Sequence, residues 1–201
     1  MTALHNLDDP RTYPSLDPSG LGERLRDLPR QCRVAWRQAL AAALPEGRTQ
    51  SGHVIIAGMG GSAIAGDLVA GLAALQGTVP ITVVRDFRLP FALDERTLAI
   101  ACSHSGNTRE VLSLFQQAVE AKATVVTMTS GGLLAKRAIE GQIPLITVNA
   151  PGEPRSAVGY NLMLLLGLLR RLELVETTDV DVHTATEALG RRVACLETNS
   201  P

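Results

Sequence analysis

With 201 residues, 45% of them apolar, the chain is long enough to bury a substantial core in a domain of ordinary size. Its formal net charge of −1 gives no basic surface of the kind that binds nucleic acid or an anionic membrane. The longest apolar run, Leu162–Leu169, is too short to span a bilayer. The three cysteines lie far apart without metal-ligand spacing, and the polar N-terminus has no signal-peptide pattern. We therefore expect a cytoplasmic protein with no metal site and no membrane or nucleic-acid partner.

The first fifty residues predict an arm followed by helices. Residues 1–18 are rich in proline and aspartate. Leu21–Leu28 and Gln31–Leu44 have helical patterns with Pro29 between them, and the second pattern places its apolar residues on one face. We assign residues 1–50 to this N-terminal helical arm.

From residue 51 onward, short apolar segments alternate with helical patterns. The segments are apolar throughout, which indicates parallel strands buried on both faces. They are His53–Ala57, Ile81–Val84, Thr97–Cys102, Thr124–Met128 and Pro144–Val148. The pattern predicts an α/β domain over residues 51–175, a three-layer αβα sandwich with a five-stranded parallel sheet. Residues 176–201 form a C-terminal segment, with a further helix over Thr184–Leu196.

In a parallel sheet all strand-to-helix loops meet at one edge, where ligands bind. The loop after the third strand carries three hydroxyls, Ser103, Ser105 and Thr108, directly before a helix. The first amides of a helix lack internal partners, and the helix dipole favours an anion there. We therefore expect a phosphate site that this loop shares with its neighbours, Gly58–Ser62, Thr129–Gly132 and Glu153–Ser156.

A purely structural interpretation of the hydroxyl loop is also open. Asn107 and Glu110 have the spacing of a capping box, and Ser105 could cap the helix instead. Capping requires one such side chain, however, and the loop has three hydroxyls. His104 lies between two of them and should point to the opposite face, so we expect packing or solvent around it rather than catalysis.

The loop after the first strand supports two interpretations. Gly60 and Gly61 let the backbone approach a ligand and Ser62 adds a hydroxyl, although these glycines could simply form a tight turn. The same loop fits a loose dinucleotide fingerprint. Arg85, followed by Asp86, ends the second strand where that fingerprint requires an acidic residue. We favour a small phosphate ester over a dinucleotide.

Arg155 occupies the first turn of its helix, where a cation opposes the dipole by about 0.3–1 kcal/mol. It could neutralise a phosphate or an enediolate oxygen, or lie in solvent beside Glu153. The helix it opens is apolar almost all round over Ala157–Leu169. A helix that covers one face of a sheet needs one apolar stripe, so we expect another subunit or domain to cover this one.

Five motifs in order over residues 53–160 resemble the bifunctional phosphoglucose/phosphomannose isomerases of the sugar isomerase (SIS) domain superfamily. The resemblance implies an SIS domain with flavodoxin-like strand order, a sugar-phosphate substrate and no cofactor. It also implies that Ser62, Ser103, Ser105 and Thr108 bind the phosphate and that Arg155 stabilises the enediolate. The motifs are Gly58-Met59-Gly60-Gly61-Ser62-Ala63-Ile64-x-Gly66-Asp67, Arg85-x-Phe87-x-Leu89-Pro90, Ser103-x-Ser105-Gly106-Asn107-Thr108, Thr129-Ser130-Gly131-Gly132 and Pro154-Arg155-x-Ala157-x-Gly159-Tyr160.

Members of that family carry two SIS domains, and the Glu, His and Lys of the second have no counterpart here. The chain thus resembles the first half of an enzyme that interconverts glucose 6-phosphate or mannose 6-phosphate with fructose 6-phosphate. Residues 176–201 would link to a second SIS domain, and the chain alone is expected to be inactive.

Three alternatives remain open at this point. The chain could be a non-catalytic sugar-phosphate sensor, or a single-domain isomerase that shares its site between subunits. In the second case its acid–base groups would come from His53, His104, Glu110 or His183. A dinucleotide oxidoreductase is the last alternative.

Overall fold

The computed structural model describes residue 6, residues 9–45 and residues 51–198. Within these ranges, five parallel strands form one sheet in the order β2-β1-β3-β4-β5. The parallel sheet and the flavodoxin-like order are both confirmed. The strands are β1 (His53–Gly58), β2 (Ile81–Val84), β3 (Thr97–Ser103), β4 (Thr124–Thr129) and β5 (Leu145–Thr147).

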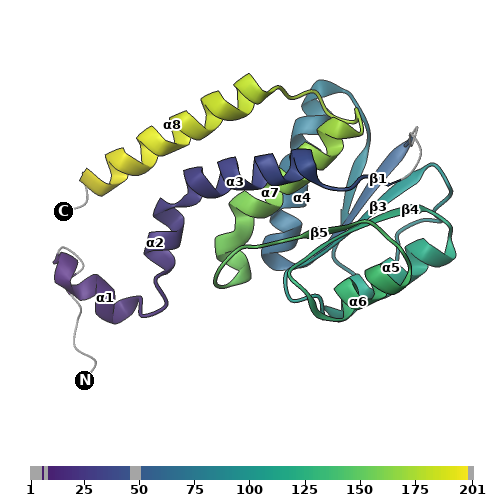
Figure 1. Ribbon diagram of the computed structural model, residues 1–201, viewed down its shortest axis with the longest axis horizontal. Coiled ribbons are helices and arrows are strands. Elements are labelled where there is room, and N and C mark those ends of the chain that lie inside the picture. The colour runs from purple at the N-terminus through teal and green to yellow at the C-terminus, as the bar shows by residue number, and fades with distance from the viewer. Residues whose placement is uncertain (1–5, 7–8, 46–50, 199–201) are drawn as a thin grey trace.

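Helices cover both faces of the sheet (Figure 1). α4 (Gly60–Gln76) and α7 (Val158–Arg171) pack on one face, and α5 (Arg109–Glu120) and α6 (Gly132–Glu140) pack on the other. Successive strand residues point to opposite faces, so Ile56, Ile100 and Met128 enter the α4/α7 core. Ala99, Ala101 and Val125 enter the α5/α6 core. This is the αβα sandwich that the unbroken apolar strands predicted.

A further helix, α3 (Leu28–Ala41), packs on the side of α7 that faces away from the sheet (Figure 1). A Cβ built at Gly167 of α7 would lie 2.5 Å from the Cβ of Ala39, so the two helices approach closely. Ten of the fourteen residues of α7 are buried within this one chain, and the other four are half-buried. Our prediction that another subunit or domain covers Ala157–Leu169 is wrong, because α3 provides that cover.

The N-terminal arm contains η1 (Pro10–Thr12), α1 (Tyr13–Leu16) and α2 (Leu21–Arg26), which extend away from the sheet (Figure 1). The break between α2 and α3 falls at Asp27 and not at the expected Pro29. Pro29 lies in the first turn of α3, where its missing N–H costs nothing. Residues 1–5, 7–8 and 46–50 of the predicted arm lie outside the described residues.

The C-terminal helix α8 (Asp179–Thr198) begins five residues before the expected Thr184 and packs on α3. Its first residue, Asp179, accepts a hydrogen bond of 2.9 Å from Trp36 Nε1 and pairs with Arg170 at 3.0 Å. The guanidinium of Arg170 also stacks 5.3 Å from the Trp36 ring centre. In the described part of the chain, none of the helices combines the length and apolarity that crossing a bilayer requires.

Candidate functional site

The β3–α5 loop brings two of its three hydroxyls together. Ser103 Oγ lies 2.9 Å from Thr108 Oγ1 and accepts a hydrogen bond of 3.1 Å from the Gly106 amide. Ser103 is 3% exposed, Thr108 is half-buried and Ser105 is exposed. Ser103 therefore stabilises the loop through these two contacts, and Ser105 and Thr108 are the more exposed hydroxyls.

The capping interpretation of this loop fails. Thr108 is the N-cap residue of α5 and makes no side-chain cap hydrogen bond. Asn107 Oδ1 instead accepts a hydrogen bond of 3.0 Å from the Leu133 amide of α6, and Ser105 Oγ accepts one of 3.2 Å from the Asn107 amide. The first amides of α5 thus keep their donors unengaged by side chains of the described residues, which is what an anion site requires.

Backbone contacts fix this loop against the β4–α6 loop. Gly106 has a φ of +68° and lies so close to the Gly131 carbonyl that no Cβ would fit. The Ser130 amide donates to the His104 carbonyl at 3.1 Å, and the Leu134 amide donates to the Gly106 carbonyl at 2.9 Å. Hydrogen bonds and close backbone packing therefore join the two neighbouring loops into one rim.

The β1–α4 loop lies next to this rim, because Gly58 pairs with Cys102 across the parallel ladder. Gly60 opens α4 with a φ of +49°, which favours glycine. Ser62, in the first turn, is 4% exposed, and its hydroxyl makes no hydrogen bond with any described residue. The strand register thus places the Gly60–Ser62 turn beside the hydroxyl loop, as expected.

The β5–α7 loop packs directly on the start of α4. A Cβ at Gly61 would lie 2.6 Å from the Pro154 carbonyl oxygen and 3.5 Å from the Arg155 Cα. Gly61 is therefore required by the contact between two loops, which is a different reason from room for a ligand. Arg155 lies in η2 (Pro154–Ala157), is exposed, and pairs with no carboxylate of the described chain.

The partner we considered for Arg155 is engaged elsewhere. Glu153 forms an ion pair with Arg24 of α2, so the charge of Arg155 stays uncompensated. Arg24 is the residue of this region that sequence reasoning missed. It lies 129 positions before its partner, and no local pattern could have linked the two.

Several remaining candidates are accounted for by structure. Arg85 pairs with Asp67, and Asp86 accepts a hydrogen bond of 2.5 Å from the Phe87 amide in its own loop. The residue directly after β2 is thus a paired arginine and not the acidic residue that a dinucleotide fingerprint requires, which disfavours a dinucleotide. His104 is half-buried, and its Nδ1 finds no partner among the described residues.

The buried thiol of Cys102 does not contribute chemistry at this edge. Burial in the core raises the pKa of Cys102 to about 12, so the thiol stays protonated at neutral pH. The described residues contain no group of three or more His, Cys, Asp or Glu side chains that could hold a metal ion.

Comparison with known proteins adds the family. No protein-family model matches the chain. A bifunctional phosphoglucose/phosphomannose isomerase from Caldicellulosiruptor bescii is 34% identical over 167 residues, which is 83% of this chain and 49% of that protein. The corresponding protein of Thermoplasma acidophilum is 34% identical over 74% of this chain and 50% of its own length. The chain is a homologue of the bifunctional phosphoglucose/phosphomannose isomerases. It spans about half the length of these relatives.

Solved structures share the αβα fold of this chain. Tagatose-6-phosphate ketose/aldose isomerase from Escherichia coli matches with a TM-score of 0.60 and 19% identity, over 89% of this chain and 53% of that one. The C-terminal domain of glucosamine-fructose-6-phosphate aminotransferase from Francisella tularensis matches with a TM-score of 0.62 and 16% identity, over 88% and 55%. At these identities the similarity establishes the fold.

Proposed function

We propose that this SIS domain binds a sugar 6-phosphate as the first half of an aldose–ketose isomerase. The substrates would be glucose 6-phosphate or mannose 6-phosphate, interconverted with fructose 6-phosphate. The observation that carries the proposal is the uncapped N-terminus of α5 beneath the hydroxyls of Ser105 and Thr108. The homology to the bifunctional isomerases supports the choice of substrate.

In this proposal the phosphate dianion takes its hydrogen bonds from four hydroxyls and from backbone amides. Ser105 and Thr108 contact it from the exposed part of the rim, and Ser62 contacts it from the start of α4. Gly60 and Gly61 keep that turn free of side chains. Ser103 contributes both a buried hydroxyl and the orientation of Thr108, its partner at 2.9 Å. Helix amides together with hydroxyl donors favour a dianion without any metal.

Arg155 is the proposed electrophilic group. Isomerisation moves a proton between C2 and C1 and builds negative charge on the enediolate oxygens. A guanidinium whose charge is not neutralised by a neighbour stabilises that charge in the transition state. Arg155 meets this condition because Glu153 is paired with Arg24. Proton transfer of this kind requires no metal or organic cofactor.

We further propose that the acid–base groups come from a second SIS domain or a second copy of the chain, in the cytoplasm. Because α7 is covered by α3, such a partner would contact a different surface from Ala157–Leu169. Ile64 and Leu68 are exposed apolar side chains of α4 that follow the Gly60–Ser62 turn, and they are 48% and 50% exposed.

Calorimetric titration tests the proposal. Fructose 6-phosphate should bind the chain, whereas unphosphorylated fructose should not, and Thr108→Ala should weaken the binding about 10-fold through the loss of charge-assisted hydrogen bonds. Ser113→Ala, on the outer part of α5, is the matched control and should bind normally. Equal binding by fructose, or no binding of either sugar, would refute the phosphate site. Full turnover by this chain alone would refute the half-site role.

A further inference from the structure

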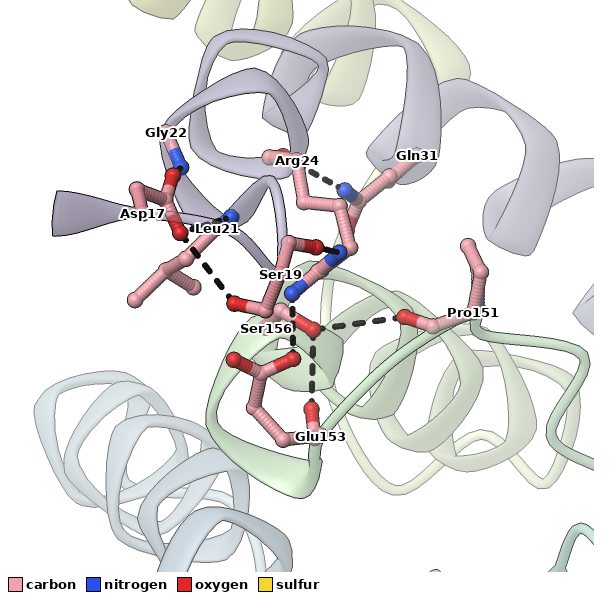
Figure 2. Close-up of polar contacts among 9 residues, drawn as sticks. All are labelled: Asp17, Ser19, Leu21, Gly22, Arg24, Gln31, Pro151, Glu153 and Ser156. Carbon is pink, nitrogen blue, oxygen red and sulfur yellow. Dashed lines mark hydrogen bonds and ion pairs between the residues drawn. The ribbon is translucent and has the colours of Figure 1, made fainter. Parts of the chain in front are cut away.

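The β5–α7 loop, which carries Arg155, is held by the N-terminal arm as well as by the sheet. Figure 2 shows the guanidinium of Arg24 reaching from α2 to the Glu153 carboxylate. The side chains are 18% and 31% exposed, respectively, so this ion pair is partly shielded from solvent. A shielded, hydrogen-bonded pair constrains its partners more than a surface pair does.

Arg24 is itself fixed by neighbouring groups. Its second guanidinium nitrogen donates to the Ser19 carbonyl, and Gln31 Nε2 donates to the Arg24 carbonyl at 2.7 Å (Figure 2). The Arg24 side chain lies against Gly152, where a Cβ would be 2.5 Å from Nε and 2.8 Å from Cζ. Gly152 also has a φ of +86°, so both its backbone conformation and the lack of room for a Cβ favour glycine at this position.

The loop beyond Glu153 turns on the backbone of that same residue. The Ser156 amide donates to the Glu153 carbonyl at 2.9 Å. Ser156 Oγ donates to the same carbonyl at 2.8 Å (Figure 2). Arg155 lies inside this turn. Any shift of Glu153 therefore moves Arg155, and release of the Glu153 carboxylate leaves an anion two residues from the Arg155 cation.

We infer that Arg24 is a positioning residue for Arg155. It acts through Glu153 in two ways: it fixes the η2 turn, and it neutralises the carboxylate that would otherwise compete for the Arg155 guanidinium. The effect of Arg24 on ligand binding by Arg155 rests on the proposed function above. The mechanical part of the inference, that Arg24 fixes the η2 turn, does not. The N-terminal helices thus have two roles: α3 covers α7, and α2 positions the loop that carries Arg155.

Hydrogen exchange tests the mechanical part without any ligand. In Arg24→Ala the Ser156 amide and its neighbours in residues 150–158 should exchange about 10-fold faster than in the unmodified chain, because local opening becomes easier. Arg30→Ala is the control, since it removes a more exposed ion pair, that of Arg30 with Asp27 at the start of α3. Unchanged exchange in Arg24→Ala would overturn the inference.

Ligand binding tests the positioning part. Arabinonate 5-phosphate is a suitable probe, because its planar carboxylate resembles the enediolate that Arg155 would stabilise. Arg24→Ala and Arg155→Ala should each weaken its binding about 10-fold, and the double variant should lose no more than Arg155→Ala alone, because the two residues act as one unit. In the same variants the affinity for fructose 6-phosphate should change less than two-fold. Additive losses, or equal losses for both ligands, would overturn the inference.

A third variant separates failure of this inference from failure of the proposed function. Glu153→Gln removes the competing charge, so combining it with Arg24→Ala should restore part of the arabinonate 5-phosphate affinity. No restoration would overturn the competition for Arg155. If the unmodified chain binds neither ligand, the proposed function fails, and the exchange experiment alone then decides whether Arg24 holds the loop.

Discussion

The contact between Gly61 and Pro154 provides the sharpest test of how the site is assembled. Gly61→Ala places a methyl group 2.6 Å from the Pro154 carbonyl oxygen and 3.1 Å from its carbon. Both atoms are backbone, so neither can rotate away, and the start of α4 or the η2 turn must shift. Overpacking of this kind costs about 1–3 kcal/mol.

The same helix contains its own control. Gly71 lies in the exposed part of α4, and a Cβ there meets nothing within 4 Å. Gly71→Ala should therefore stabilise the protein by about 0.5–1 kcal/mol through the lower backbone entropy of the unfolded chain. Because both substitutions are Gly to Ala in one helix, the difference between them isolates the steric cost at Gly61.

Urea denaturation and thermal melting measure that difference. We expect the two variants to differ by at least 1 kcal/mol in free energy of unfolding, and by roughly 2–12 °C in Tm for a chain of this size. Gly61→Ala should also weaken fructose 6-phosphate binding, because the substitution displaces the Gly60–Ser62 turn. If Gly61→Ala is as stable as Gly71→Ala, the close packing of the β1–α4 and β5–α7 loops is refuted.

Two further predictions concern groups whose pKa is shifted. Burial raises the pKa of Cys102 to about 12, so its thiol should resist a disulfide reagent at pH 8 in the native chain and react in urea. Cys102→Ala assigns the signal to this cysteine, and rapid reaction of the native chain would contradict its burial. The hydrogen bond from Trp36, followed by that from Arg170, lowers the pKa of Asp179. The pKa of Asp179 in the folded chain lies below its unfolded value of about 4. The stabilisation from the Asp179 carboxylate is therefore complete above about pH 4 and is lost as the pH falls through the folded pKa. The stability gap between the unmodified chain and Asp179→Asn should therefore narrow on acidification below pH 4, and a gap independent of pH would refute the pairing.

The sequence by itself determined the parallel sheet and the position of the hydroxyl loop at the edge of that sheet. Largely apolar segments such as His53–Ala57 favour burial on both faces, which is typical of parallel strands covered by helices. Parallel strands then bring their carboxyl ends together whatever the rest of the chain does. For that reason the sequence predicts the hydroxyl loop Ser103–Thr108 at this edge, and the loop lies there, between the end of β3 and the start of α5.

Long-range packing decided what local patterns leave open. The sequence showed that Ala157–Leu169 is apolar all round, but apolar contact is not directional, so it could not show that α3 is the cover. Asn107 had the spacing of a capping residue, yet its amide oxygen found the Leu133 amide of a neighbouring helix instead. The pairing of Arg24 with Glu153 joins segments 129 residues apart, and only the folded chain brings such charges into contact.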